Sequence, residues 1–192
     1  MLLDSTPRTP ADPTPTTDHR PADEVAAWSA DTPVGPLTVL AVNGTVVAAG
    51  FCPATDLHHR LPPARRGPLT VRSDLGPISE AVDRYLAGDL DALDHIPVDQ
   101  AGTELQCEVW DGLRAIPAGQ TRTYTELAAT TSRPAAVRAA GTACGRNLVA
   151  PIVPCHRALR TDGTLGGYYY GLEVKRWLLE HEAGNRPPNR GR

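Results

Sequence analysis

The feature that most constrains the fold is a single change of hydrophobic pattern near residue 100. Over residues 25–51 apolar side chains follow a strand-like pattern, whereas from residue 103 onward they recur at helical spacing. Within the first part, the runs Leu37–Val42 and 45–51 are separated by Asn43-Gly44, the dipeptide that favours a type I′ turn. The sequence therefore predicts a β-hairpin here and an α+β fold for the whole chain.

The remainder of the first part completes a small α+β domain, predicted over residues 24–98. Residues 53–68 are rich in Pro, Arg and Gly, which indicates a loop. Apolar residues at helical spacing then predict a helix over Pro77–Leu86 that stops at Gly88. Residues 89–102 show little periodicity and contain Asp, Pro and Gly, so they are predicted to be a linker that contains the domain boundary.

The second part, residues 103–184, is predicted to be a mostly helical domain. Helix start and stop signals indicate one helix capped by Thr103 and broken at Pro117, one over residues 124–130, one from Pro134 to Gly145, and one over residues 172–182. The second of these opens with a capping-box pattern. Two short helices joined by a tight turn favour a helix-turn-helix.

The ends of the chain and its cysteines indicate the cellular compartment in which the protein works. Residues 1–23 are rich in Pro, Thr and Asp, without a signal peptide's basic start or apolar core, so they and residues 185–192 are predicted to be flexible, disordered tails. No apolar run is long enough to span a bilayer. The four cysteines form no CxxC pair, which favours free thiols in a reducing compartment. We therefore expect a cytoplasmic, intracellular protein, and a monomer because no extended apolar surface motif is visible.

Charge is spread unevenly along the chain. Residues 1–100 contain 7 Arg and 14 Asp or Glu, a net −7, whereas residues 101–192 contain 12 Lys or Arg and 8 Asp or Glu, a net +4, giving −3 overall. A contact with a polyanion is therefore expected in the second part. A solvated basic face accounts for the charge equally well.

The most informative stretch is an apolar run that ends at Cys155, followed by His156 and Arg157. Cationic neighbours favour the thiolate, which is the nucleophilic form, and a nearby His can take the thiol proton directly or through a water. By themselves these three residues fit a structural cysteine equally well. The other three cysteines have no such neighbours.

Cys155 also belongs to a longer set of residues at fixed spacings. The set comprises Pro154-Cys155-His156-Arg157, Gly163, Gly166-Gly167-Tyr168, Gly171-Leu172, Lys175, Trp177-Leu178-Leu179 and His181-Glu182, with further matches upstream that include Val109-Trp110, Ile116-Pro117, Tyr124, Arg138-Ala139 and Gly145-Arg146-Asn147. Over residues 103–184 this pattern resembles the O6-alkylguanine-DNA alkyltransferases, also called methylated-DNA-protein-cysteine methyltransferases. Residues 32–51 resemble the start of that family's N-terminal domain, which implies an RNase H-like fold for it.

The resemblance implies a catalytic set and a single-turnover repair reaction. Cys155 would accept a methyl or other alkyl group from O6 of guanine in duplex DNA, with O4-alkylthymine as a further candidate substrate. His156 would reach Cys155 through a bound water, Glu182 would hold and charge-balance His156, and Tyr168 would help protonate the leaving O6. The thioether product requires no cofactor. No metal is expected either, because Cys52, His58 and His59 do not make four ligands at ordinary spacing.

The resemblance also implies a set of DNA-binding residues. A base inside a duplex must be turned out before it can react, and Arg138 would insert into the stack in its place. Ala136 and Ala139 would allow the helix to approach the minor groove closely. Tyr124 would press on the extruded nucleotide, and Asn147 would tie the helix to the active-site turn. On their own, these residues fit an exposed Arg, tight helix packing, a core Tyr and a helix C-cap equally well.

An active-site loop is implied over residues 163–171. A carbonyl near Ala158 would receive the amino group of the base. Family members vary at the two positions after Tyr168, and here both are tyrosines, Tyr169 and Tyr170. Two large side chains should narrow the pocket, which predicts a preference for methyl over bulky adducts such as benzyl.

Three alternatives remain open at this point. A binding protein of the same fold would recognise alkylguanine without accepting the alkyl group, but such relatives replace the nucleophile that is present here as Cys155. A helix-turn-helix regulator would carry several base-reading polar side chains on its recognition helix instead of alanines. An unrelated Cys-His hydrolase would place the two residues far apart in sequence.

Overall fold

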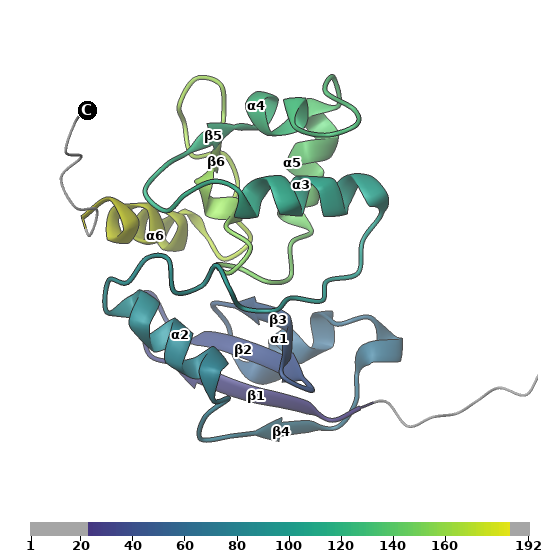
Figure 1. The fold of residues 1–192 in the computed structure, drawn as a ribbon, viewed down its shortest axis with the longest axis vertical. Helices are drawn as coiled ribbons and strands as arrows, with labels where there is room; N and C mark the ends of the chain where they lie inside the picture. The colour runs from purple at the N-terminus through teal and green to yellow at the C-terminus, as the bar shows by residue number, and fades with distance from the viewer. Residues whose placement is uncertain (1–22, 185–192) are drawn as a thin grey trace, which may run out of the picture.

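The computed structural model describes residues 23–184. Apart from Asp23, the tails predicted over residues 1–23 and 185–192 lie outside the described residues. The fold is α+β: a four-stranded sheet with two of the helices forms one part, and a mostly helical part lies against it (Figure 1). The RNase H-like and helix-turn-helix descriptions stay predictions.

The sheet is built around the predicted hairpin. Its strands are β1 (Val25–Ala30), β2 (Leu37–Val42), β3 (Thr45–Gly50) and β4 (Leu69–Val71), in the order β3-β2-β1-β4. Strand β1 pairs antiparallel with β2 and parallel with β4, and β2 pairs antiparallel with β3. Asn43 and Gly44 have φ of 49° and 77°, the positive values that a type I′ turn requires. The hairpin prediction is confirmed.

The loop predicted over residues 53–68 is wrong in part. That segment contains helix α1 (Ala54–Arg60) and a 3₁₀ turn, η1 (Pro63–Arg65). Leu57 and Leu61 are fully buried and pack with the face of the sheet formed by Val25, Leu40 and Ala48, which stabilises the helix despite the Pro and Arg around it. Helix α2 (Pro77–Leu86) has the predicted bounds.

Residues 89–102 are irregular, as predicted, but they are not a free linker. Leu93 and Ile96 are buried in the main core. The N–H of Val46 donates to the carbonyl of Pro97 at 2.9 Å, and the N–H of Asp99 donates to the carbonyl of Val46 at 2.9 Å. This segment therefore joins the two parts by packing along the hairpin, and the domain boundary within it stays a prediction.

The helical part begins where the cap signals placed it. Helices α3 (Glu104–Arg114) and α4 (Tyr124–Ala129) both open with complete capping boxes, from Thr103 and Thr123. Helix α5 (Val137–Gly145) begins three residues later than predicted, because residues 133–136 form a separate turn. Helix α6 (Leu172–Gly184) follows η2 (Cys155–Arg157) and a two-residue ladder of β5 (Arg122–Thr123) with β6 (Ala158–Leu159), neither of which was predicted.

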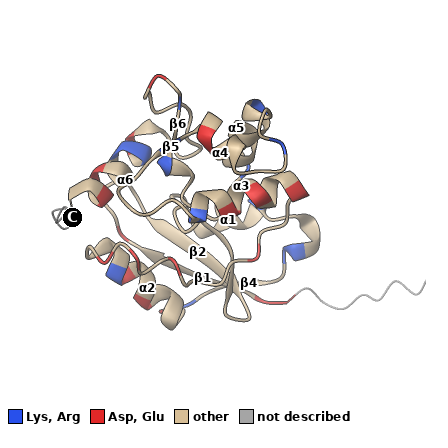
Figure 2. Ribbon diagram, turned by 45° about the horizontal axis from the view of Figure 1, so that its top comes forward, with Lys and Arg blue, Asp and Glu red and all other residues tan. Residues whose placement is uncertain are grey.

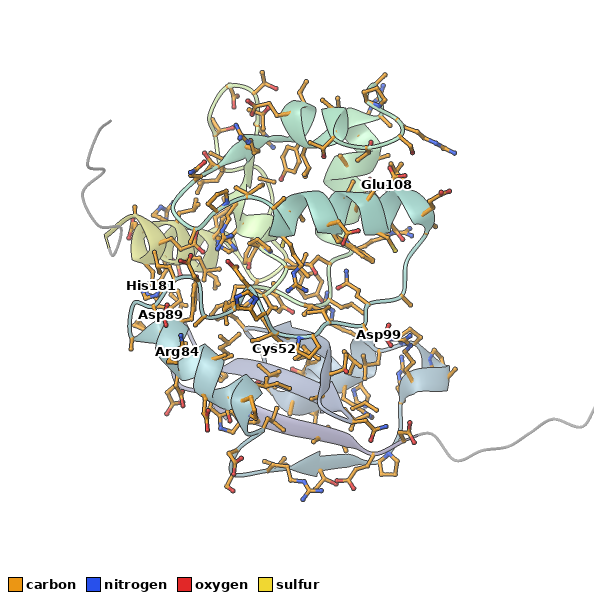
Figure 3. The ribbon with its side chains drawn as sticks, viewed as in Figure 1. Cys52, Arg84, Asp89, Asp99, Glu108 and His181 are labelled. Carbon is orange, nitrogen blue, oxygen red and sulfur yellow. The ribbon has the colours of Figure 1, made fainter. Side chains whose placement is uncertain are left out.

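One continuous core joins the two parts. The N–H of Ala49 on β3 donates to the carbonyl of Leu148 at 2.8 Å, beside buried apolar residues from both parts. His181 on α6 stacks on Trp177 and donates through Nε2 to the carbonyl of Tyr85 on α2 at 2.9 Å. Figure 3 shows His181 at this junction, next to Arg84 and Asp89. None of the described helices is long and apolar enough to cross a membrane.

Candidate active site

The nucleophile predicted from the sequence lines a cavity. Cys155 begins the 3₁₀ turn η2, directly after Pro154, and only 7% of the residue is exposed. The cavity has a volume of about 240 Å³, and it is lined by the residues Tyr124, Gly141, Cys144, Gly145, Asn147, Ala150, Cys155, Gly167, Tyr168, Tyr169 and Tyr170. The structure thus brings the end of α5, the cysteine turn and the predicted active-site loop together around one sulfur atom.

Asn147 holds the cysteine turn in place. Its Nδ2 donates to the carbonyl of Val153 at 2.7 Å and lies 3.2 Å from Sγ of Cys155, while its Oδ1 accepts from the N–H of Val149 at 2.9 Å. Asn147 follows the C-cap residue of α5 and is itself buried. The contact between this helix end and the active-site turn, which the resemblance implied, is present.

The expectation that the residues beside Cys155 favour its thiolate is wrong. Burial raises the pKa of Cys155, and the groups that oppose this are Asn147, Lys175, its own backbone and Arg60, not His156 or Arg157. The reason is geometric: both residues that follow Cys155 direct their side chains to Glu182. Burial of Cys155 therefore disfavours the thiolate, and the two residues that follow it do not offset this effect.

His156 is fully buried and fixed by Glu182. Its Nε2 lies 2.8 Å from Oε1 of Glu182, and since a carboxylate only accepts, this nitrogen carries the proton. Nδ1 is then the basic nitrogen of the ring; it is buried and has no hydrogen-bond partner among the described residues. Burial lowers the pKa of His156 against the opposing effect of Glu182, which favours the neutral imidazole.

Glu182 is the centre of a network that sequence reasoning found only in part. Besides His156, it accepts from the guanidinium of Arg157 at 2.8 and 3.0 Å, from the hydroxyl of Tyr85 at 2.9 Å, and from the N–H of Gly119 at 3.1 Å. Burial alone would raise the pKa of this carboxyl, but His156 and Arg157 outweigh it and hold the pKa well below its usual range. A buried carboxylate with this many donors stays ionised.

Lys175 is a further residue whose role the sequence did not reveal. It is completely buried on α6, and its Nζ donates to the carbonyls of Ala158, at 2.7 Å, and of Leu165. The lysine thus joins the cysteine turn to the start of the active-site loop. It also occupies one acceptor position of Ala158, the carbonyl that the resemblance assigned to the amino group of the base. An exposed-looking Lys in an amphipathic helix carries no sequence signal for this burial.

Replacing Lys175 with Met is expected to reduce the free energy of unfolding by about 2–5 kcal/mol, because two carbonyls lose their charged donor at little change in volume. Urea denaturation measures the loss. Arg176→Met is the matched control: the next residue of α6 is exposed, and its replacement should change the free energy by no more than about 0.5 kcal/mol. Equal losses in the two variants would contradict the anchoring role.

Comparison with known proteins assigns this arrangement to a family. Residues 104–184 match the family described as "6-O-methylguanine DNA methyltransferase, DNA binding domain". The methylated-DNA–protein-cysteine methyltransferase of Shigella flexneri is 38% identical over 159 residues, which is 79% of this chain and 91% of that protein. Its namesake in Mycobacterium bovis is 41% identical over 82% of this chain and 92% of that protein. The chain belongs to the methylated-DNA–protein-cysteine methyltransferase family.

Solved structures agree with this membership. The crystal structure of the O6-methylguanine methyltransferase of Mycobacterium tuberculosis superposes with a TM-score of 0.71 at 34% identity, over 86% of this chain and 96% of that one. A second structure from the same organism, described as a complex with DNA, has the same TM-score and identity over 85% of this chain.

In this methyltransferase the three tyrosines of the active-site loop have different surroundings. The hydroxyl of Tyr168 is buried and has no partner among residues 23–184, and burial raises its pKa well above the usual value. Tyr169 is 62% exposed at the rim of the cavity. Tyr170 is half-buried and packs edge-on against Phe51 of the other part of the molecule.

The predicted DNA-binding residues gather around α4 and α5 of the methyltransferase. Arg138 is exposed, and Ala136 and Ala139 are half-exposed, near the start of α5. Tyr124 opens α4 and lines the cavity, and burial raises its pKa to about 12. Figure 2 shows basic and acidic segments interspersed at this end of the molecule. Five exposed arginines here, namely Arg122, Arg133, Arg138, Arg146 and Arg160, form no ion pair within the described part of the chain.

Proposed function

We propose that this protein repairs DNA by direct transfer of a methyl group from O6 of guanine to Cys155, one group per protein molecule. Membership of the methyltransferase family makes it a DNA-repair transferase of this kind. The observation that carries the proposal is that Cys155 lines a cavity of about 240 Å³ and is followed in the chain by a histidine whose Nε2 is bound to Glu182, which leaves its Nδ1 without a partner among the described residues.

The proposed step conserves atoms and charge. The proton of the Cys155 thiol passes to Nδ1 of His156, directly or through a water, and Glu182 with Arg157 balances the imidazolium that forms. A lone pair of Sγ then bonds to the alkyl carbon as the bond from that carbon to O6 breaks. The hydroxyl of Tyr168 gives its proton to the base and so neutralises the negative charge left on it. The proton held by His156 then passes to the oxygen of Tyr168 and restores the hydroxyl.

The same geometry accounts for a single turnover. The product is a thioether on a buried sulfur, and a thioether has no ionisable proton and is a poor leaving group. Among the described residues Cys144 is the other thiol that lines the cavity, and burial raises its pKa to about 12, which disfavours its nucleophilic form. We therefore propose that the protein is consumed in the reaction. We further propose that it acts as an intracellular monomer.

The arginine-bearing end of the molecule supports a DNA partner. A base can enter the cavity only if it leaves the duplex, and the cavity opens beside α4 and α5. Here unpaired arginines face solvent, as contacts with phosphates require. Small side chains at Ala136 and Ala139 support close approach of DNA to the backbone of α5, and the exposure of Arg138 supports its proposed role of filling the gap in the stack.

The direct test is intact-protein mass spectrometry with a duplex that contains one O6-methylguanine. Each protein molecule should gain the mass of one methyl group in place of one hydrogen, and the gain should stop at one equivalent and map to Cys155. Tight binding to the duplex without a mass change would show a lesion-recognition protein instead. The presence of Cys155 in the cavity disfavours a non-catalytic binding protein, and the alanines on α5 disfavour a regulator.

Arg138→Ala is expected to weaken binding to the O6-methylguanine duplex by about tenfold. The substitution removes a positive charge close to the phosphates and the side chain proposed to insert into the base stack. Fluorescence anisotropy over a salt series measures this, and the slope of log Kd against log salt should fall by about 1. Arg84→Ala is the matched control, since Arg84 lies on α2, at the opposite part of the molecule, paired with Asp89 (Figure 3). Equal weakening in both variants would exclude a specific role of Arg138.

A further inference from the structure

One contact links the far part of the molecule to the wall of the alkyl cavity. Arg60, the last residue of α1, donates from its guanidinium to the hydroxyl of Tyr170 at 2.6 Å. The same guanidinium lies over the ring of Tyr169, with its central carbon 3.6 Å from the ring centroid. Both tyrosines line the cavity above Cys155, whereas Arg60 does not.

The surroundings of Tyr170 are shaped to receive it. Its hydroxyl also lies 3.4 Å from the carbonyl of Ala49, and a Cβ atom at Gly50 would lie 1.8 Å from that hydroxyl. A side chain at Gly50 would therefore expel the ring. Tyr170 packs edge-on against Phe51, with 6.0 Å between ring centroids, so the end of β3 forms a seat for it.

Arg60 is the only cation that holds the two rings together among the described contacts. Within residues 23–184 no carboxylate forms an ion pair with it. Its planar group both stacks and donates, which a lysine cannot do in one geometry. Tyr169 is otherwise exposed, so without Arg60 it would regain its rotamer freedom and open the rim of the cavity.

We propose that Arg60 is a latch that sets the breadth of the alkyl cavity by holding Tyr169 and Tyr170 closed over Cys155. Arg60 is a positioning residue that determines which adducts fit. This inference rests on the proposed alkyl transfer. It goes beyond the presence of two large tyrosines, because it makes the selectivity for small adducts depend on a residue of α1, about a hundred positions away in sequence.

The test compares two substrates in four proteins. Rate constants for alkyl transfer to Cys155 are measured with O6-benzylguanine as the free base and with the O6-methylguanine duplex, for the wild type, Arg60→Ala, Arg60→Lys and Tyr169→Ala. In Arg60→Ala the ratio of the benzyl to the methyl rate constant should rise about tenfold, which matches the loss of a partly desolvated cation–π contact and a hydrogen bond. Arg60→Lys should give a ratio between those of the wild type and Arg60→Ala, because a lysine cannot stack and donate in one geometry.

A double-mutant cycle separates a latch from a general effect of charge. If Arg60 acts through the tyrosines, Arg60→Ala should change the ratio much less in a protein that already carries Tyr169→Ala and Tyr170→Ala. A ratio that rises in Tyr169→Ala but not in Arg60→Ala would overturn the latch. So would an equal change of both rate constants, since that would place the effect on the thiol.

A second measurement tests the latch without any chemistry. Amide hydrogen exchange over residues 163–171 should be faster in Arg60→Ala than in the wild type, with Arg60→Lys in between. If the wild type takes no methyl group from the duplex, the proposed function fails, and the exchange data alone decide the latch. Unchanged exchange in Arg60→Ala would refute it.

Discussion

Cys155→Ala is expected to abolish alkyl transfer completely while the protein still binds the O6-methylguanine duplex. The substitution removes the sulfur that becomes part of the product, so no other residue can compensate for it by a slower route. Alanine fits the site because it is smaller than the buried Cys155 and the turn around this position is held by Asn147 through the carbonyl of Val153. The mass gain should disappear, and anisotropy should show a Kd within about threefold of the wild type.

Cys107→Ala is the matched control for this experiment. Cys107 is half-exposed on α3 and does not line the cavity, so its replacement tests whether thiol loss in general affects the protein. It should take up one methyl group as the wild type does. A mass gain in Cys155→Ala that maps to Cys144, the other thiol of the cavity, would show that the assignment of the nucleophile is wrong.

Local signals predicted the parts of this fold that are determined locally. Asn43-Gly44 produced the turn that it favours, and Thr103 and Thr123 produced helix starts with both halves of their capping boxes. These features depend on the chemistry of a few consecutive residues, which the sequence displays directly. Helix α1 escaped notice because its stability comes from Leu57 and Leu61 beneath the sheet, which is a long-range contact.

The sequence predicted which residues belong to the site but not all of the hydrogen bonds that connect them. The family pattern marked Cys155, His156 and Glu182, and the structure joins the last two by a hydrogen bond of 2.8 Å. The same pattern could not show that Tyr85 and Gly119, from two other segments, donate to Glu182, because neither has any periodic or spacing relation to it. The contact of Arg60 with Tyr169 and Tyr170 likewise has no signal in the sequence.

The thiolate argument failed for a related reason. Adjacency in sequence was taken as adjacency of charge, but on a 3₁₀ turn successive side chains point in different directions. Arg157 extends away from Cys155 to Glu182 and the carbonyl of Ile116. Its charge therefore stabilises the carboxylate of Glu182, which orients His156. Arg157 does not act on the sulfur of Cys155 directly.

Glu182→Gln should lower the single-turnover transfer rate by on the order of 10³ and the free energy of unfolding by about 3–5 kcal/mol. The amide keeps the size of the side chain but brings two hydrogens among donors from His156, Arg157 and Gly119, and it leaves the charge of Arg157 buried without a partner. His156 then loses the group that fixes its tautomer. Glu180→Gln, at an exposed position of α6, should change neither quantity appreciably.

Lowering the pH should remove the stabilisation that the Glu182 carboxylate contributes. The pKa of Glu182 in the folded protein lies well below its usual range, whereas the unfolded chain should titrate at about 4.3. The stability that the carboxylate contributes is therefore complete above the unfolded pKa and is lost as pH falls through the folded one. In urea denaturation the gap between wild type and Glu182→Gln should shrink below about pH 4.3. A gap that stays constant down to pH 3, roughly a unit lower, would mean that the charge of Glu182 is not what holds Arg157 and His156.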